Sequence, residues 1–273
     1  MKKWWIVILV VVFAIAIIIT FLLIGKNRSK PQSEKPQTVE EAIITPTIED
    51  LSYFSLVPRR DGNAFNLIVK RIPNDASIDY EITYTTLENL SQGIVGEAKA
   101  GQNEYQYEHL FGTCSKNVCK YDKGVEFGQL TAQFKEPQKR YHTSFDFHLQ
   151  NLGFVGGKLS LKDESASLDI PAGAISSSQF FISHQTGGLP SSVKEKILIG
   201  SPVGFFSSAG DRLSKEATLT VNLPKTPEGE VVAWGWDGKN EKWVEFPAEI
   251  KESKVTSKVN LLTAYIVIGK EAK

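Results

Sequence analysis

The stretch Ile78-Asp-Tyr-Glu-Ile-Thr-Tyr-Thr85 alternates an apolar or aromatic residue with a polar one at every position. A period of two places successive side chains on opposite faces of a strand, whereas a helix has a period near 3.6. The apolar half consists of isoleucine and tyrosine, which fit a pleated, half-buried surface well. The stretch therefore predicts a β-strand with one buried face.

The same alternation recurs on both sides of this stretch, and no sustained helical period appears between residues 50 and 150. Combinations that favour turns separate the runs, at Arg60-Asp-Gly-Asn63, Pro73-Asn-Asp75 and Gly101-Gln-Asn103. About seven strands at roughly ten-residue spacing are typical of an immunoglobulin-like or fibronectin type III-like sandwich. We expect this architecture for residues 49–151; the resemblance is one of architecture only.

A second β-rich unit is expected over residues 152–273. It contains three short motifs of moderate specificity, in the order Ile170-Pro-Ala-Gly-Ala174, Ser201-Pro-Val-Gly-Phe-Phe206 and Ala217-Thr-Leu-Thr-Val-Asn-Leu-Pro224. With the tryptophan-containing strands that follow, residues 155–270 resemble a ZU-five domain of zona-occludens and netrin-receptor type proteins, as found in microbial surface proteins. This resemblance implies a β-sandwich that serves interaction or bears force, with no catalytic residues to assign. Independently, Pro171 is expected to end a strand and Gly173 to adopt a positive φ in the turn after it.

The N-terminus predicts a membrane anchor. Trp4–Ile24 contains 21 residues and no charge, which as a helix would cover roughly 31 Å and cross a hydrocarbon core. A cleaved signal peptide is the alternative, but its apolar region is shorter, about 7 to 15 residues, and ends in a small-residue cleavage site. We therefore expect a single transmembrane helix within residues 1–25.

A linker and an extracytoplasmic orientation are expected beyond the anchor. Residues 26–48 combine prolines, glutamines and mixed charges, a composition typical of a solvated spacer. The basic residues on both sides of the span do not decide the orientation: counted literally, they slightly favour a cytoplasmic C-terminal part. Large domains translocate largely regardless of charge, and the rest of the chain is of an extracytoplasmic type, so we expect the domains outside.

The only two cysteines, Cys114 and Cys119, are separated by four residues and lie in a polar segment with glycine at both ends, between two expected strands. Half a zinc site is the alternative, but no second cysteine pair exists and the histidines lack metal-site spacing. Behind a membrane anchor, a disulfide that closes a protruding hairpin tip is the better interpretation.

Catalytic and cofactor sites are not predicted. No Gly-x-Ser-x-Gly elbow or phosphate-binding glycine loop occurs. His184 follows Ser183 on an expected strand, which favours a satisfied surface histidine, and turn carboxylates such as Asp61 and Asp163 favour solvated charge over a calcium site. The net charge is zero, with 31 basic and 31 acidic residues, which argues against nucleic acid as a partner.

Two function classes remain. The first is a membrane-anchored, non-catalytic interaction or structural protein of the cell surface or envelope. The second is a carbohydrate-binding or accessory module of a cell-wall-active complex, with Trp234 and Trp236 as the candidate ligand-facing aromatics. The partner is accordingly expected to be another protein or a surface polysaccharide, and no cofactor or metal is predicted.

Overall fold

The fold is built from antiparallel β-strands. A computed structural model describes residues 46–116, 118–135, 140–193 and 196–269. Within these ranges no helix is long and apolar enough to cross a membrane. The predicted anchor and most of the predicted linker lie outside the described residues. The all-β prediction is confirmed for the described part of the chain.

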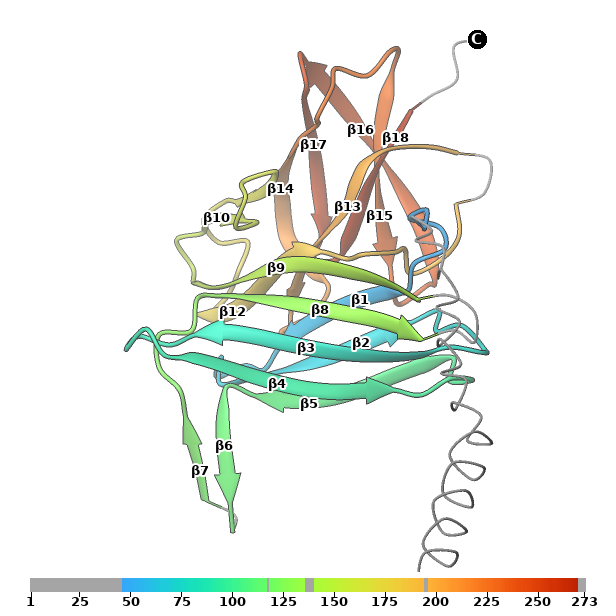
Figure 1. Cartoon of the computed structure of the whole chain (residues 1–273). Helices are drawn as coiled ribbons and strands as arrows, with labels where there is room; N and C mark the ends of the chain where they lie inside the picture. Colours follow the sequence, from blue (N-terminus) through green and yellow to red (C-terminus); the bar gives the residue numbers. More distant parts are fainter. Residues whose placement is uncertain (1–45, 117, 136–139, 194–195, 270–273) are drawn as a thin grey trace, which may run out of the picture. The chain divides into compact units, whose positions relative to one another are not determined.

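The described residues form these strands: β1 (Tyr53–Pro58), β2 (Ala64–Lys70), β3 (Ser77–Thr85), β4 (Ser91–Ala98), β5 (Glu104–Leu110), β6 (Gly112–Ser115), β7 (Val118–Tyr121), β8 (Phe127–Lys135), β9 (Arg140–Leu152), β10 (Gly157–Ser160), β11 (Ala166–Ile170), β12 (Gln179–Gln185), β13 (Ile197–Ser207), β14 (Arg212–Asn222), β15 (Val231–Asp237), β16 (Lys242–Lys251), β17 (Lys254–Leu261) and β18 (Ala264–Gly269). Figure 1 shows their arrangement.

Thirteen of these strands form one continuous sheet, in the order β10-β11-β14-β17-β16-β15-β18-β13-β12-β9-β8-β3-β4. A second sheet contains β1-β2-β5, and β6 and β7 form a separate hairpin. Strand β16 changes partners along its length: its first part pairs with β15 and Ala248–Lys251 pairs with β17. The large sheet therefore turns back on itself at β16.

The first core lies between the β1-β2-β5 sheet and the β3-β8-β9 part of the large sheet. It contains the apolar residues that the alternating pattern predicts to face inward, Phe65, Leu67, Val69, Ile78, Tyr80, Ile82, Tyr84, Leu130, Ala132 and Phe134. Their neighbours in the same strands are exposed or half-buried, apart from the buried Ala64 at the start of β2. The period-two interpretation of these strands is confirmed.

The second core lies inside the folded-back part of the large sheet and collects side chains from β10–β14, β15, β17 and β18, among them Leu168, Phe205 and Tyr265. Pro171 follows the last residue of β11, and Gly173 has φ of 74° in the next turn, as predicted.

Strand β12 belongs to both cores. It pairs with β9 on one side and β13 on the other, so the sheet continues across the predicted boundary at residues 151 and 152. Phe181 packs in the second core and its neighbour Ile182 packs in the first. All described residues belong to one compact unit. The division into two domains stays a prediction.

His184 joins β1 to β12 and is fully buried, so its predicted surface position was wrong. Its Nε2 accepts a hydrogen bond from the Leu56 backbone N–H at 3.2 Å, while its Nδ1 lies 2.7 Å from the Gln185 carbonyl oxygen. Its ring packs between those of Phe145 and Phe206, with centroids 5.0 and 5.1 Å away. Both faces of β12 are buried here, and an alternating pattern could not reveal that.

Candidate functional site

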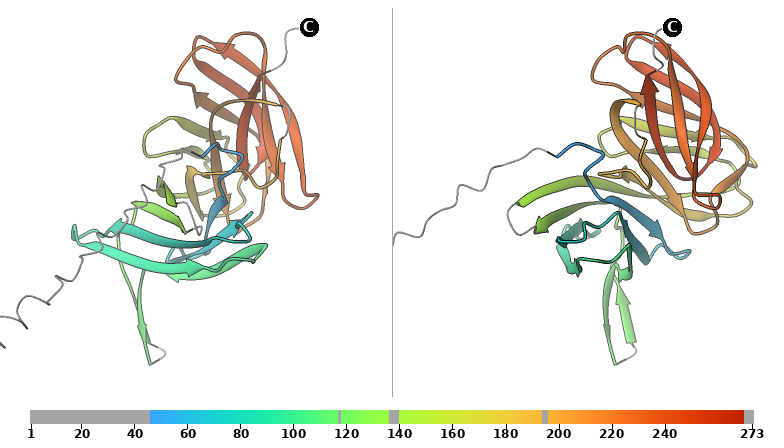
Figure 2. Two further views of the ribbon diagram at one scale, coloured as in Figure 1. Left: turned by 45° about the vertical axis from the view of Figure 1, so that its right-hand side comes forward. Right: turned by 90° about the vertical axis from the view of Figure 1, so that its right-hand side faces the viewer.

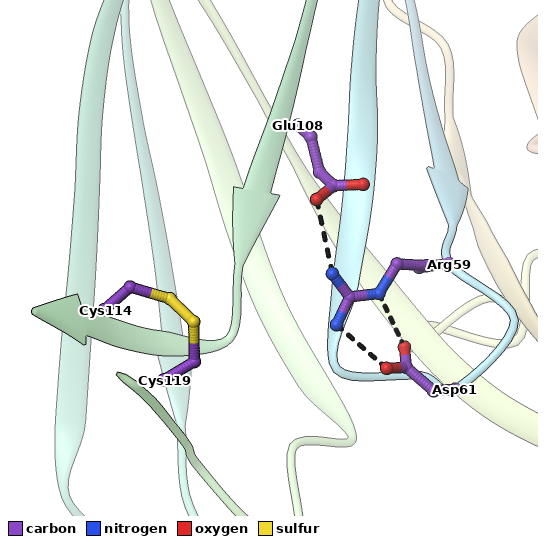
Figure 3. The surroundings of a disulfide bond; sticks show 5 residues. All are labelled: Arg59, Asp61, Glu108, Cys114 and Cys119. Carbon is purple, nitrogen blue, oxygen red and sulfur yellow. Dashed lines mark hydrogen bonds and ion pairs between the residues drawn. A yellow bond between two sulfur atoms is a disulfide. The ribbon is translucent and has the colours of Figure 1, made fainter. Parts of the chain in front are cut away.

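The disulfide-linked hairpin β6–β7 is the candidate site, and we call it the arm. Cys114 and Cys119 are direct cross-strand partners and form a disulfide, which confirms the predicted pair (Figure 3). Among the described residues, β6 and β7 pair only with each other. The arm stands clear of both sheets in Figures 1 and 2. Most of its side chains are exposed.

Two glycines and a buried phenylalanine define the root of the arm. Gly112 has φ of 140°, and a Cβ there would lie 2.2 Å from the Lys120 carbonyl oxygen. Gly124 has φ of 68° and lies against Leu87. Both positions favour glycine because L side chains rarely adopt such φ values and because a Cβ would collide with its neighbour. Phe111 is buried in the first core, with its ring 5.0 Å from that of Phe65.

Hydrogen bonds connect the root of the arm to the rest of the fold, which we call the body. The Tyr84 hydroxyl donates to the Asp122 carboxylate at 2.8 Å. The Leu87 N–H donates to the Lys123 carbonyl at 2.7 Å, and the Phe111 N–H donates to the Asn63 carbonyl at 2.9 Å. These contacts reach three different segments of the body. The arm is thus held at its base, whereas residues 113–116 and 118–120 are exposed.

Arg59 braces the same end of the molecule. Its guanidinium donates two hydrogen bonds to Asp61, at 2.9 and 2.8 Å, and forms an ion pair with Glu108 at 3.2 Å (Figure 3). It also lies 5.5 Å from the centre of the Tyr121 ring in β7. The hydrogen bonds from Arg59 lower the pKa of Asp61 to about 2. Asp61 therefore keeps its charge at neutral pH, and Arg59 links β7 to the turn after β1.

The exposed surface of the arm is basic with one apolar residue. Lys116 and Lys120 are exposed and have no ion pair among the described residues, and Val118 is 73 % exposed. The arm contains no acidic residue. It therefore offers positive charge and a small apolar contact.

Replacing Cys114 and Cys119 together with serine should lower the melting temperature by only a few degrees, roughly 2–5 °C. The bridge closes a short loop, so it constrains little of the unfolded chain and contributes about 2 kcal/mol at most. Hydrogen exchange should become faster in β6 and β7 and stay unchanged in β3. Loss of cooperative unfolding in the double variant would show instead that the arm supports the whole fold.

The predicted ligand-facing aromatics lie on one face of β15 and β16. Trp234 and Trp236 are half-buried, and Trp243 lies directly opposite Trp236 with ring centroids 5.4 Å apart. Trp234 donates to Glu245 at 3.3 Å, and the Lys196 ammonium lies 5.9 Å from its ring centre. The buried indole N–H of Trp243 has no hydrogen-bond partner in the described part of the chain. We call these three residues the tryptophan strip.

The groups considered for catalysis lie apart from one another. Both cysteines are in the disulfide, so neither is a free thiol. His109 is a buried residue of β5, and its Nε2 lies 2.9 Å from the Tyr80 hydroxyl oxygen. Burial lowers the pKa of His109 to about 4. Both ring nitrogens of His184 form hydrogen bonds with backbone groups. No group of acidic, histidine or cysteine side chains in the described ranges could hold a metal ion.

Sequence reasoning located the disulfide but missed the root of the arm. Glycines on both sides of the cysteine segment signalled a protrusion, but Arg59, Tyr84 and Leu87 lie far from it in sequence. Their contacts arise from the packing of the sheets, and no short motif encodes them.

Comparison with models of known protein families and with curated proteins finds no match to this chain. The site is therefore interpreted from its own geometry and charge.

Proposed function

We propose that the chain is a membrane-anchored, non-catalytic interaction protein of the cell surface or envelope, with its β-rich part outside the cytoplasm. The arm carries this proposal: a disulfide-linked hairpin, fixed at its root, exposes its sides to solvent. Such preorganisation reduces the entropy that is lost when a surface binds a partner.

The extracytoplasmic placement is supported by the disulfide. Disulfides persist in oxidising compartments and are rare in the cytosol of most organisms. The bond joins two exposed residues at the periphery, so the cellular redox environment reaches it directly. We further propose that residues 49–151 are immunoglobulin- or fibronectin III-like and that residues 152–273 are ZU-five-like.

The anchor is supported by the uncharged Trp4–Ile24 stretch. The full-length chain should sediment with membranes and remain there after carbonate extraction, because a spanning helix buries about 20 apolar residues in lipid. A variant with Ile8, Val12 and Ile15 replaced by aspartate should be released, since each charge at the helix centre costs about 3 kcal/mol. A soluble protein with a mature N-terminus near residue 25 would refute the anchor.

A second candidate, carbohydrate binding, is favoured by the tryptophan strip. The indole rings of Trp234 and Trp236 are half-buried and can stack on the apolar face of a sugar ring. A glycan array with the full-length protein, compared with its Trp236→Ala variant, separates the two candidates. Binding that requires Trp236 supports the glycan role; no binding by either protein leaves the arm as the interaction element.

A further inference from the structure

Strand β4 leaves one edge of the large sheet open. In the part of the chain that the structure describes, it is the last strand in the order and pairs only with β3 (Figure 1). Its sequence, Ser91-Gln-Gly-Ile-Val-Gly-Glu-Ala98, contains no proline and no lysine. Proteins normally block such edges with proline, lysine, bulges or a covering segment, because unpaired backbone groups recruit another strand. Within the described residues, β4 has no second paired strand and no bulge in its register with β3, and Glu97 is its only charged residue.

The outer face next to this edge is acidic around one exposed valine. Val95 is 77 % exposed, and Glu81 and Glu97 are exposed without an ion pair among the described residues. A hollow of about 270 Å³ beside Val95 is lined in part by Asp79 and Glu81. The Asp79 carboxylate pairs with Lys135, which leaves the two glutamates as the uncompensated charge.

The arm has the complementary pattern with the same spacing. Val118 and Lys120 point to one face of β7, two residues apart, as Val95 and Glu97 do in β4. The edges of β6 and β7 that face away from the hairpin are also unpaired among the described residues. Strand addition of β7 to β4 would therefore place valine near valine and lysine near glutamate, as direct or diagonal cross-strand neighbours.

We propose that the arm of one copy adds to the β4 edge of the next copy, with Lys120 against Glu97 and Glu81 and with Val118 against Val95. The partner is thus a second copy of this chain, which deepens the interaction role proposed above and rests on it. Arm and edge are different surfaces, so each copy can donate one and accept the other. Such a head-to-tail contact continues from copy to copy unless the ring closes.

Pairing of β4 with a second β4 is less favourable. It would bring Glu81 and Glu97 of both copies to one surface, and like charges across neighbouring strands are destabilising. The basic arm relieves this repulsion.

Charge-reversal substitutions at Lys120 and Glu97 test the proposal. Self-association of the full-length protein, kept in one detergent, is measured by analytical ultracentrifugation. The natural chain should self-associate with increasing concentration. Lys120→Glu alone and Glu97→Lys alone should each associate at least about tenfold more weakly, because each sets like charges against one another. The chain with both changes should regain association, as should a mixture of the two single variants. Lys225→Glu, an exposed control on the loop after β14, should behave like the natural chain.

A natural chain that stays monomeric at the highest attainable concentration would overturn the proposal, as would single variants that associate normally. A photo-crosslinker in place of Val95 provides the second measurement in native membranes. Crosslinks to residues 116–121 of another copy support the proposal. Crosslinks to a different protein, to lipid, or to nothing contradict it, and the first of these outcomes would leave the general interaction role intact.

Discussion

Acidification from pH 7 to pH 4 should lower the free energy of unfolding by about 3 kcal/mol through His184 alone. Burial lowers the pKa of His184 to about 4, from an ordinary value of 6.5 in the unfolded chain. Its ring is enclosed by Phe145 and Phe206, and its Nε2 accepts from the Leu56 N–H. Protonation of Nε2 would turn this acceptor into a second N–H donor, which would face the Leu56 N–H.

The sign follows from proton binding. Between pH 6.5 and 4 the unfolded chain binds a proton at His184 that the folded chain does not, so stability is fully present above pH 6.5 and is lost as the pH falls toward 4. His109, whose pKa burial also lowers to about 4, acts in the same direction and window. The carboxyl of Asp61, with its pKa of about 2, contributes mostly at lower pH.

Chemical denaturation at several pH values measures this effect. His184→Gln should be destabilised at pH 7 and should lose about 3 kcal/mol of the pH dependence. His142→Gln is the matched control, because His142 is exposed in β9. An unchanged pH dependence in His184→Gln would mean that His184 is not buried in neutral form.

Replacement of Phe181 with alanine should lower the free energy of unfolding by about 3–5 kcal/mol. Phe181 is fully buried in the second core, in the strand that both cores share. Because Ile182 packs in the first core from the same strand, loss of β12 should disrupt both. Hydrogen exchange in β3 and fluorescence of the tryptophan strip should therefore report one common transition.

Phe154→Ala is the control of matched size. Phe154 is 65 % exposed on the turn after β9, so its removal should change stability by no more than about 0.5 kcal/mol. Two separate transitions in the natural chain, one for each core, would show that residues 49–151 and 152–273 unfold independently.

The sequence predicted the inward-facing residues of strands that have one buried face and one solvent-exposed face. The alternation in β2, β3 and β8 predicted their inward residues correctly, and Pro171 and Gly173 predicted the end of β11. It was uninformative at β12, where both faces are covered, and so His184 was placed at the surface. The order of the strands in the sheet could not be predicted from the sequence either. The pairing of β9 with β12, for example, depends on packing between segments that are distant in the chain.

The candidate site was predictable to a similar degree. Two cysteines separated by four residues in a glycine-flanked polar segment pointed to a bridged tip, and the bridge is present. The root contacts, the open β4 edge and the matched charges on the arm emerge only once the strands are in place. Each of these depends on which strand ends at an edge, a property of the whole sheet.

Protease treatment of intact cells or spheroplasts tests the proposal that the β-rich part lies outside the cytoplasm on a membrane anchor. Added protease should degrade the chain after residue 45, while a short N-terminal fragment stays in the membrane. Complete protection in intact cells, with degradation only after lysis, would contradict it.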